Sequence, residues 1–436
     1  MKKLFLIGVI YLCLHPTFAT DSAPENLQDE RQLNTIILCE VAEILKKRFE
    51  TVIKINSYTF LSDPDRRNSL VRITLEGSSP EVPKNVIFKQ SLPKESDEDN
   101  KGAFARFARE WAVLEFLSGV PNAFHSVPQL YGGSKENKFV LIEDLGEIHV
   151  SLVDSLTLPG EQKAIESLQR YMKALGSFHA SSFRKTDRYC DMLNLINENN
   201  IHFENDIVLE IKNALPAVYS VLEKLGLALT TELKDEIVMV IESMIELGPF
   251  TVLTHGDLCP DNVFDNAEKG ELRLIDFELA SVGNALLDGV YLRMSMPTGW
   301  CAKAIPDELI AQLETIYRDQ LRQTIPAADN DAEYNVAYTN ACAYWSLFTI
   351  LEMESEDVWE QEKIGESPVV LPGGHLWKPE DNFMRPRLIS RLQAFVAVTE
   401  EPAVLPHLRQ LAQQLLDRIQ KRWPDAKALG VYPAFE

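Results

Sequence analysis

The strongest constraint on the fold is that strand patterns and helix patterns occupy different parts of this chain. Within residues 20–146, four segments have the β-branched and aromatic content of strands and are bounded by polar turns. These strands are predicted at 52–60, 70–75, 86–90 and 139–143, with amphipathic helices at 33–49 and 104–117. The short spacers between the first three strands favour an antiparallel meander. The sequence therefore predicts a small strand-rich N-terminal lobe.

Residues 147–436 are dominated by helix patterns instead. Apolar residues recur at the helical period in 161–180, 207–225, 231–247, 307–322, 332–354, 387–398 and 405–422. A pair of strands is predicted within this region, at 251–254 and 272–275. A segment rich in Pro and Gly, 364–385, has the length of a functional or disordered loop. Together the two parts predict an α+β fold with a larger, mainly helical C-terminal lobe.

The charge balance limits the kinds of partner. The chain has 436 residues, with 65 Asp and Glu against 43 Lys and Arg, which gives a formal net charge of −22. This excess of negative charge repels nucleic-acid backbones and anionic lipid surfaces. We therefore expect no nucleic-acid partner, and the acidic surface is compatible with a cationic small molecule.

One motif lies between the two strands predicted in the second lobe. The sequence HGDLCPDN fills positions 255–262, and the second strand leads into IDFE at 275–278. The pattern His-Gly-Asp-x4-Asn arises by chance on the order of once in ten thousand chains of this length. Because the two segments are joined by a short connection, we expect Asp257, Asn262 and Asp276 to converge on one point.

These residue types suit phosphoryl transfer, which depends mainly on positioning the reactants and neutralising their charge. A free aspartate has a pKa of about 3.9, so Asp257 would orient a hydroxyl and accept its proton late. Asn262 offers an uncharged oxygen and Asp276 a charged one, which are ligands that Mg²⁺ prefers. The sequence therefore predicts Asp257 as the catalytic residue and Asn262 with Asp276 as the metal ligands.

From about residue 68 to 293, these motifs resemble the aminoglycoside phosphotransferase and choline kinase-like family of the protein-kinase-like superfamily. The resemblance implies a two-lobed kinase fold that binds ATP and Mg²⁺ and phosphorylates an alcohol group. It gives His255 a structural role in the motif. It also implies that an aspartate within 283–288 braces the catalytic loop, and that His179 lies on a helix packed beneath that loop.

The resemblance also implies a nucleotide site in the first lobe. The segment VIFK at 86–89 looks like the strand whose lysine, here Lys89, reaches the ATP phosphates. Its helix partner is Glu110, with Glu115 as the second choice and an ordinary surface pair as the alternative. Opposite charges about 4 Å apart gain roughly 4 kcal/mol at an effective dielectric near 20, enough to hold the lysine in place.

The segment LIEDL at 141–145 looks like the family's adenine-binding linker, so Glu143 and Leu145 are predicted to lie at the adenine ring. Two departures from the family pattern affect the site. The loop 63–69 contains no glycine, so Ser69 or the loop amides would contact the phosphates. Position 278, after Asp276 and Phe277, is glutamate where protein kinases have glycine, which favours a small-molecule acceptor.

The predicted function is transfer of the γ-phosphate of ATP to a hydroxyl of a small molecule that resembles an aminoglycoside, choline or a sugar. Two alternatives remain open: transfer of AMP to a protein, and a catalytically silent, secreted binding protein on a kinase fold. The tryptophans at 345, 359 and 377 are compatible with a cage for a cationic substrate, although core packing is the favoured interpretation.

The N-terminus points to a different compartment from the rest of the chain. Residues 1–19 have the pattern of a signal peptide, with two lysines before an apolar run and small residues at the cleavage position. The run is shorter than the roughly 20 residues of a membrane-spanning helix, so no stable insertion is expected. The five cysteines that follow are widely spaced and odd in number, and there is no Asn-x-Ser/Thr site. These features indicate a reducing, ATP-containing cytoplasmic compartment, so localisation is left between export and cytoplasm.

Overall fold

The fold is taken from a computed structural model that describes residues 31–77, 79–93, 97–120, 126–197, 206–351, 369–370, 376–377, 384–400 and 404–436. Its elements in the first lobe are α2 (Thr35–Phe49), β1 (Ile53–Phe60), β2 (Asn68–Gly77), β3 (Asn85–Ser91), α3 (Asp97–Ser118), β4 (Leu130–Ser134) and β5 (Phe139–Glu143). The predicted signal peptide at 1–19 lies outside the described residues, as do Trp359, the side chain of Trp377 and most of the loop 364–385.

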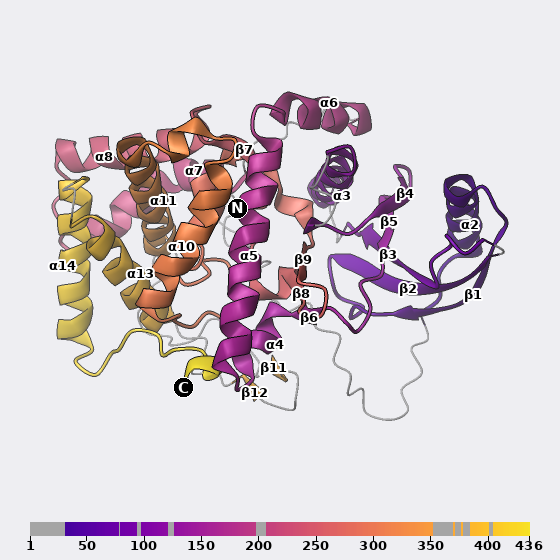
Figure 1. The fold of residues 1–436 in the computed structure, drawn as a ribbon. Coiled ribbons are helices and arrows are strands. Elements are labelled where there is room, and N and C mark those ends of the chain that lie inside the picture. Colours follow the sequence, from indigo (N-terminus) through magenta and orange to yellow (C-terminus); the bar gives the residue numbers. More distant parts are fainter. Residues whose placement is uncertain are drawn as a thin grey trace.

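The first lobe is a five-stranded antiparallel sheet in the order β1-β2-β3-β5-β4. In Figure 1 the sheet lies between α2 and α3. One face buries Phe88 and Leu141 against α2, and the other contributes Val140 and Ile142 to the core around α3. Strand alternation therefore places Phe88 on the α2 face and its neighbour Lys89 on the α3 face.

The second lobe begins with β6 (Val150–Ser151) and is mainly helical. Its helices are α4 (Leu152–Thr157), α5 (Glu161–Ser182), α6 (Thr186–Ile196), α7 (Asp206–Lys224), α8 (Thr231–Ile245), α9 (Ala285–Gly289), α10 (Asp307–Leu321), α11 (Asp331–Leu351), α13 (Met384–Val398) and α14 (Pro406–Arg422). Figure 1 shows α14 at the end of the molecule farthest from the sheet. The predicted fold class, with a strand-rich first part and a larger helical second part, is confirmed.

The predicted strand pair in the second lobe is wrong in its pairing. Strand β7 (Thr251–Thr254) pairs with β10 (Ser281–Asn284), whereas β9 (Glu271–Leu274) pairs with β8 (Val263–Asn266). The strands β8 and β10 are four residues long and partly polar, so their sequences carry too little alternation to be recognised. The observed pairing brings the segment after β7 and the segment after β9 to the same place from two separate sheets.

The core of the second lobe contains almost the whole of α11. Trp345 is only 2% exposed and donates its indole N–H to the carbonyl of Leu287 at 2.9 Å. It therefore belongs to the core and not to a ligand cage, as the packing interpretation predicts. The five described cysteines form no disulfide with one another. Within the described ranges, no helix combines the length and apolar character that a bilayer crossing requires.

Candidate active site

The motif loop, residues 255–262, leaves the end of β7 through a glycine in a left-handed conformation. Gly256 has a φ of +83°, and a Cβ at this position would lie 2.7 Å from the carbonyl oxygen of Leu279. No other residue type fits this turn without moving the backbone that follows β9. The glycine of the motif is therefore required for the close approach of the two segments that carry Asp257 and Asp276.

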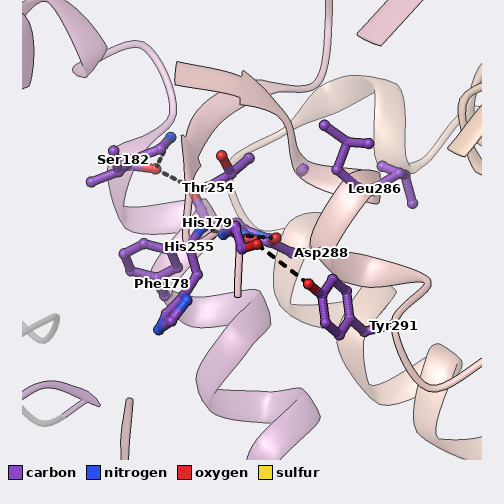
Figure 2. Close-up of polar contacts among 12 residues, drawn as sticks. Phe178, His179, Ser182, Thr254, His255, Leu286, Asp288 and Tyr291 are labelled. Atoms are coloured by element: carbon purple, nitrogen blue, oxygen red, sulfur yellow. Dashed lines mark hydrogen bonds and ion pairs between the residues drawn. The ribbon is translucent and has the colours of Figure 1, made fainter. Parts of the chain in front are cut away.

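Asp288, in α9, holds the start of the motif loop. Its Oδ2 accepts the backbone N–H of His255 at 2.6 Å, and its Oδ1 accepts that of Gly256 at 3.2 Å. His179, from α5, lies 3.1 Å from Asp288 through Nε2 and 2.8 Å from the Tyr317 hydroxyl through Nδ1. Figure 2 shows His179 and the backbone of His255 beside Asp288. The aspartate expected within 283–288 thus contacts the loop directly, and His179 lies beneath it.

His255 is buried and has both ring nitrogens in use. Nε2 donates to the carbonyl of Ile275 at 2.9 Å, and Nδ1 accepts the backbone N–H of Asp257 at 3.3 Å. Burial lowers the pKa of His255, against the opposing effect of Asp288. A neutral ring is the only form that donates on one side and accepts on the other, so His255 links the motif loop to the end of β9 and is a structural residue.

Asp257 is 7% exposed, and its carboxylate is surrounded by hydrogen-bond donors. Oδ1 accepts from the Thr298 hydroxyl at 2.6 Å and from the Cys259 thiol at 3.0 Å, while Oδ2 lies 3.3 Å from the Asn262 amide nitrogen. Burial raises the pKa of Asp257 to about 7, although the bonds from Cys259 and Thr298 act in the opposite direction. This carboxyl group is therefore poised to exchange a proton near neutral pH.

Asn262 and Asp276 are held on either side of the hairpin formed by β8 and β9. Asn262 donates its amide N–H to the carbonyl of Asp257 at 2.9 Å, which leaves the amide oxygen as the atom that it can offer to a cation. Its own backbone carbonyl accepts the N–H of Ile275 at 3.0 Å. Asp276 has a φ of +66°, an uncommon conformation for a residue other than glycine. The structure thus brings Asp257, Asn262 and Asp276 together, from a loop and the neighbouring hairpin.

Lys89 reaches this cluster from the sheet. Its ammonium lies 2.9 Å from Glu110 in α3 and 2.5 Å from Asp276, and both Lys89 and Glu110 are almost fully buried. Glu115, the second choice from the sequence, is exposed. The pair is therefore formed with Glu110 and is not a surface pair.

The ionisation of this cluster reflects its burial. Burial raises the pKa of Glu110 to about 7, and Lys89 only partly offsets this effect. For Asp276, burial also acts to raise the pKa, but Lys89 and Arg67 more than offset it and hold the pKa below its usual value. One ammonium thus faces two carboxylates, with Asp257 beyond them, so the cluster has an excess of negative charge that a divalent cation would balance.

The donor set fits magnesium. The available ligands are one amide oxygen and one carboxylate, and Mg²⁺ characteristically uses one or two carboxylates and completes its shell with phosphates and water. Among the described residues there is no group of three or more His, Cys, Asp or Glu side chains arranged as a metal site. A dedicated protein-only cage is accordingly absent from that part of the chain, and Asn262 with Asp276 are the residues suited to hold the ion.

The glycine-free loop lies against Glu278, which is 2% exposed. Arg67 forms an ion pair with Glu278, and the Asn68 side chain donates to it at 2.8 Å. The strand register pairs Leu70 with Lys89 and Ser69 with Gln90, so Ser69 lies on the face of the sheet opposite to Lys89. The side chains that this loop brings to Glu278, two residues after Asp276, are therefore those of Arg67 and Asn68, and not that of Ser69.

The linker between the lobes contains Glu143 and Leu145. The Glu143 carboxylate accepts the backbone N–H of Gln129 at 3.1 Å, and the Leu145 carbonyl lies 2.7 Å from Nδ1 of His149. Asp144 between them binds Arg72 through two bonds of 2.8 and 3.2 Å. The linker is thus tied to the sheet and to its own following turn, and no contact joins Glu143 or Leu145 to the cluster around Lys89 among the bonds described.

Sequence reasoning missed two contributors to the site. Thr298 bonds to Asp257 from a segment about forty residues downstream that contains no recognisable motif. Arg106, in α3, lies 3.6 Å from Glu278, and no sequence motif connects the two residues. The burial of Glu278, which calls for a basic partner, is visible only in the structure.

Comparison with known proteins places the chain in a family. The profile of the ecdysteroid kinase-like family matches residues 68–328. No curated protein sequence matches the chain.

Solved structures with similarity include three kinases. They are a choline kinase from Cryptosporidium parvum (12% identity, TM-score 0.40, 89% of this chain and 99% of that one), an ethanolamine kinase from Plasmodium vivax (12%, 0.39, 85% and 92%) and a choline kinase from Streptococcus pneumoniae (16%, 0.35, 83% and 100%). Because the family profile covers more than half of the chain, this protein belongs to the ecdysteroid kinase-like family.

Proposed function

We propose that the chain transfers the γ-phosphate of ATP, with Mg²⁺, to a hydroxyl group of a small molecule. The observation that carries this proposal is the convergence of Lys89, Asp257, Asn262 and Asp276 in one buried cluster, drawn from both lobes. A catalyst of phosphoryl transfer needs little more than such a set of positioned charges.

Each residue of the cluster has a role that its contacts support. Lys89, held by Glu110 at 2.9 Å, is placed to bind nucleotide phosphates once it leaves Asp276. Asn262 and Asp276 would hold the metal ion through oxygen. Bound Mg²⁺ would neutralise charge on the phosphates and favour departure of the nucleoside diphosphate. The backbone of Glu143 and Leu145, in the linker between the lobes, would bind the adenine ring.

Asp257 would orient the acceptor hydroxyl. Its Oδ1 is occupied by two donors, so Oδ2 is the atom available to the incoming group. A pKa of about 7 in the absence of ligands means that the group can accept a proton from the acceptor as the new bond forms, and a cation nearby would lower that pKa.

The acceptor is proposed to be a small hydroxylated molecule. The description of the family names an ecdysteroid, and the names of the similar structures add choline and ethanolamine. The net charge of −22 is compatible with the cationic members of this set.

Labelled ATP tests the reaction type. Incubation with Mg²⁺ and a panel of these acceptors should move label from the γ-position to a small molecule and leave α-label in ADP. Transfer of α-label to a protein would instead support AMP transfer and contradict the proposal.

Binding of Mg·ADP without turnover supplies a second readout. A ligand at about 100 times its dissociation constant should stabilise the folded chain by about 2.7 kcal/mol, measured as a thermal shift. The absence of any shift, in a protein that is folded by circular dichroism, would favour the catalytically silent binding protein.

A further inference from the structure

Residues 294–300, which we call the strap, contact the motif loop at three side chains. Thr298 donates its hydroxyl to Oδ1 of Asp257 at 2.6 Å and lies 3.1 Å from the Cys259 thiol. Trp300 donates its indole N–H to Oδ2 of Asp261 at 3.3 Å. The strap therefore reaches the motif loop at Asp257, Cys259 and Asp261, all within the turn before Asn262.

The strap has an unfavourable backbone conformation. Ser295 and Met296 have φ values of +55° and +49°, in the left-handed region that L-residues with side chains adopt at a cost. Consecutive residues in this region persist only where the surroundings hold them. Two local bonds contribute, from the N–H of Met296 to the carbonyl of Tyr291 and from that of Gly299 to the carbonyl of Met296, both at 2.8 Å.

Two buried arginines of α13 also hold the strap in this conformation. Arg391 is 0% exposed and donates to the carbonyls of Met294 and Pro297 at 3.1 and 3.0 Å. Arg387 is 1% exposed and donates to the carbonyls of Gly299 and Trp300 at 2.6 and 2.5 Å. Burial of a guanidinium is costly unless its donors are satisfied. Here both groups direct donors at the same short segment, so α13 fixes the strap at both ends.

These contacts fix the orientation of the Asp257 carboxylate. With Thr298 and Cys259 both bonded to Oδ1, rotation of the carboxylate would break two bonds, one of them short and charge-assisted. Tyr291 places its hydroxyl 3.0 Å from that of Thr298 and donates to the carbonyl of Gly256 at 3.3 Å. Figure 2 shows Tyr291 directed at the same turn as Asp288 and His255. Oδ2 is thereby presented in one direction.

We propose that Thr298 is a positioning residue for phosphoryl transfer, and that Arg387 and Arg391 hold it in place through the strap. The inference rests on the proposed function, because it assigns Thr298 the task of aiming Asp257 at the acceptor. It also makes a structural claim that holds without turnover: the strap covers Cys259, whose Sγ lies 3.8 Å from where a Cβ of Gly299 would be.

The first test uses full-length wild type, Thr298→Val and Thr298→Ser, with Mg·ATP as donor and water as acceptor. Loss of one charge-assisted hydrogen bond should lower kcat for phosphate release by about ten- to a hundredfold in Thr298→Val. The KM for ATP and the Kd for Mg·ADP should stay within about twofold of wild type, because neither nucleotide contact changes. Thr298→Ser, which keeps the hydroxyl, should restore kcat.

Thr399→Val is the matched control for this series. Thr399 is also fully buried and donates to a carbonyl, that of Phe395 at 2.9 Å, but it lies beyond the end of α13 and away from the motif loop. Its kcat should equal that of wild type. A Thr298→Val enzyme with the wild-type kcat, or a Thr298→Ser enzyme as slow as Thr298→Val, overturns the assignment of Thr298.

The second test separates failure of this inference from failure of the proposed function. In Arg391→Met the strap loses two of its four arginine bonds, so N-ethylmaleimide should alkylate Cys259 about tenfold faster or more, located by peptide mass spectrometry. The control Arg418→Met removes an exposed arginine of α14 and should leave the rate unchanged. Unchanged alkylation in Arg391→Met overturns the strap. If wild type neither binds Mg·ADP nor releases phosphate, the proposed function fails. The alkylation result then decides by itself whether Arg391 holds the strap over Cys259.

Discussion

The buried carboxyl group of the residue Asp257 lowers the stability of the folded chain when it ionises. Its ordinary pKa is 3.8, and burial raises it to about 7 in the folded chain. Between these two values the folded state binds a proton that the unfolded state has lost. Stability is therefore greatest below the unfolded pKa and falls as pH rises through the folded pKa.

Asp257→Asn should accordingly stabilise the ligand-free protein most at about pH 8 and less at about pH 5, where the folded wild type is already protonated and only the unfolded chain has lost the proton. The gain is expected to be on the order of one to a few kcal/mol in the free energy of unfolding, measured by urea denaturation at both pH values. A variant that is less stable than wild type at the higher pH would contradict a raised pKa of Asp257 in the folded chain.

Lys89 contributes to stability instead, because its ammonium group pairs with the buried carboxylates of Glu110 and Asp276. Lys89→Met should destabilise the chain by about 3–5 kcal/mol at neutral pH, because Glu110 is left buried without its cation and Asp276 is left with Arg67 alone of the two cations that lower its pKa. The loss should shrink at about pH 5, where Glu110, with a pKa raised to about 7, takes up a proton.

Lys54→Met is its control. The Lys54 side chain is 72% exposed and pairs with Glu76 at 3.2 Å on the surface, so its removal should change the unfolding free energy by about 1 kcal/mol or less. Equal effects of the two substitutions in chemical denaturation would contradict the buried-cluster description.

Among the elements, the site depends on how the strand pair β7–β10 approaches the hairpin β8–β9. Gly256 follows β7 and contacts the turn η3 (Phe277–Leu279) that follows Asp276. The sequence predicted the strands that carry the motif but paired them incorrectly, because partners of four residues have no pattern of their own. The approach itself was implied by the motif, and the glycine that permits it was part of that motif.

Gly256→Ala should test this approach. A Cβ there would lie 2.7 Å from a backbone oxygen, so η3 has to move and Asp276 with it. We expect a loss of more than about 1 kcal/mol in stability and a weaker response to Mg²⁺ in thermal-shift titrations.

Gly270→Ala distinguishes the effect of the steric contact at Gly256 from the effect of a positive φ alone. Gly270 also has a positive φ, +65°, but nothing lies within 4 Å of its added Cβ. Its thermal shift with Mg²⁺ should match that of wild type. If both alanine variants lose the Mg²⁺ response equally, the steric argument for Gly256 is incorrect.

At the scale of the whole molecule, the sequence predicted what local patterns determine. Long periodic segments gave the long helices, and alternation with polar turns gave the meander β1-β2-β3, whereas the shorter helix α6 was not predicted. The strand β4 was missed because its sequence, LYGGS, lacks alternation. The interactions of Thr298 and Arg387 could not be predicted, since they join segments far apart in the chain and depend on the packing of α13 against the second lobe.

We propose that the buried cluster transfers a phosphoryl group to a small-molecule hydroxyl, with Asp257 orienting the acceptor. The most direct test of this proposal is acceptor-dependent transfer of γ-labelled phosphate, comparing wild type with Asp257→Asn in the presence of Mg²⁺. We predict a labelled small molecule from wild type and at least about a hundredfold slower labelling by Asp257→Asn, with Mg·ADP binding retained. Equal labelling by the two proteins would contradict the role of Asp257, and label found only on protein would contradict transfer to a small molecule.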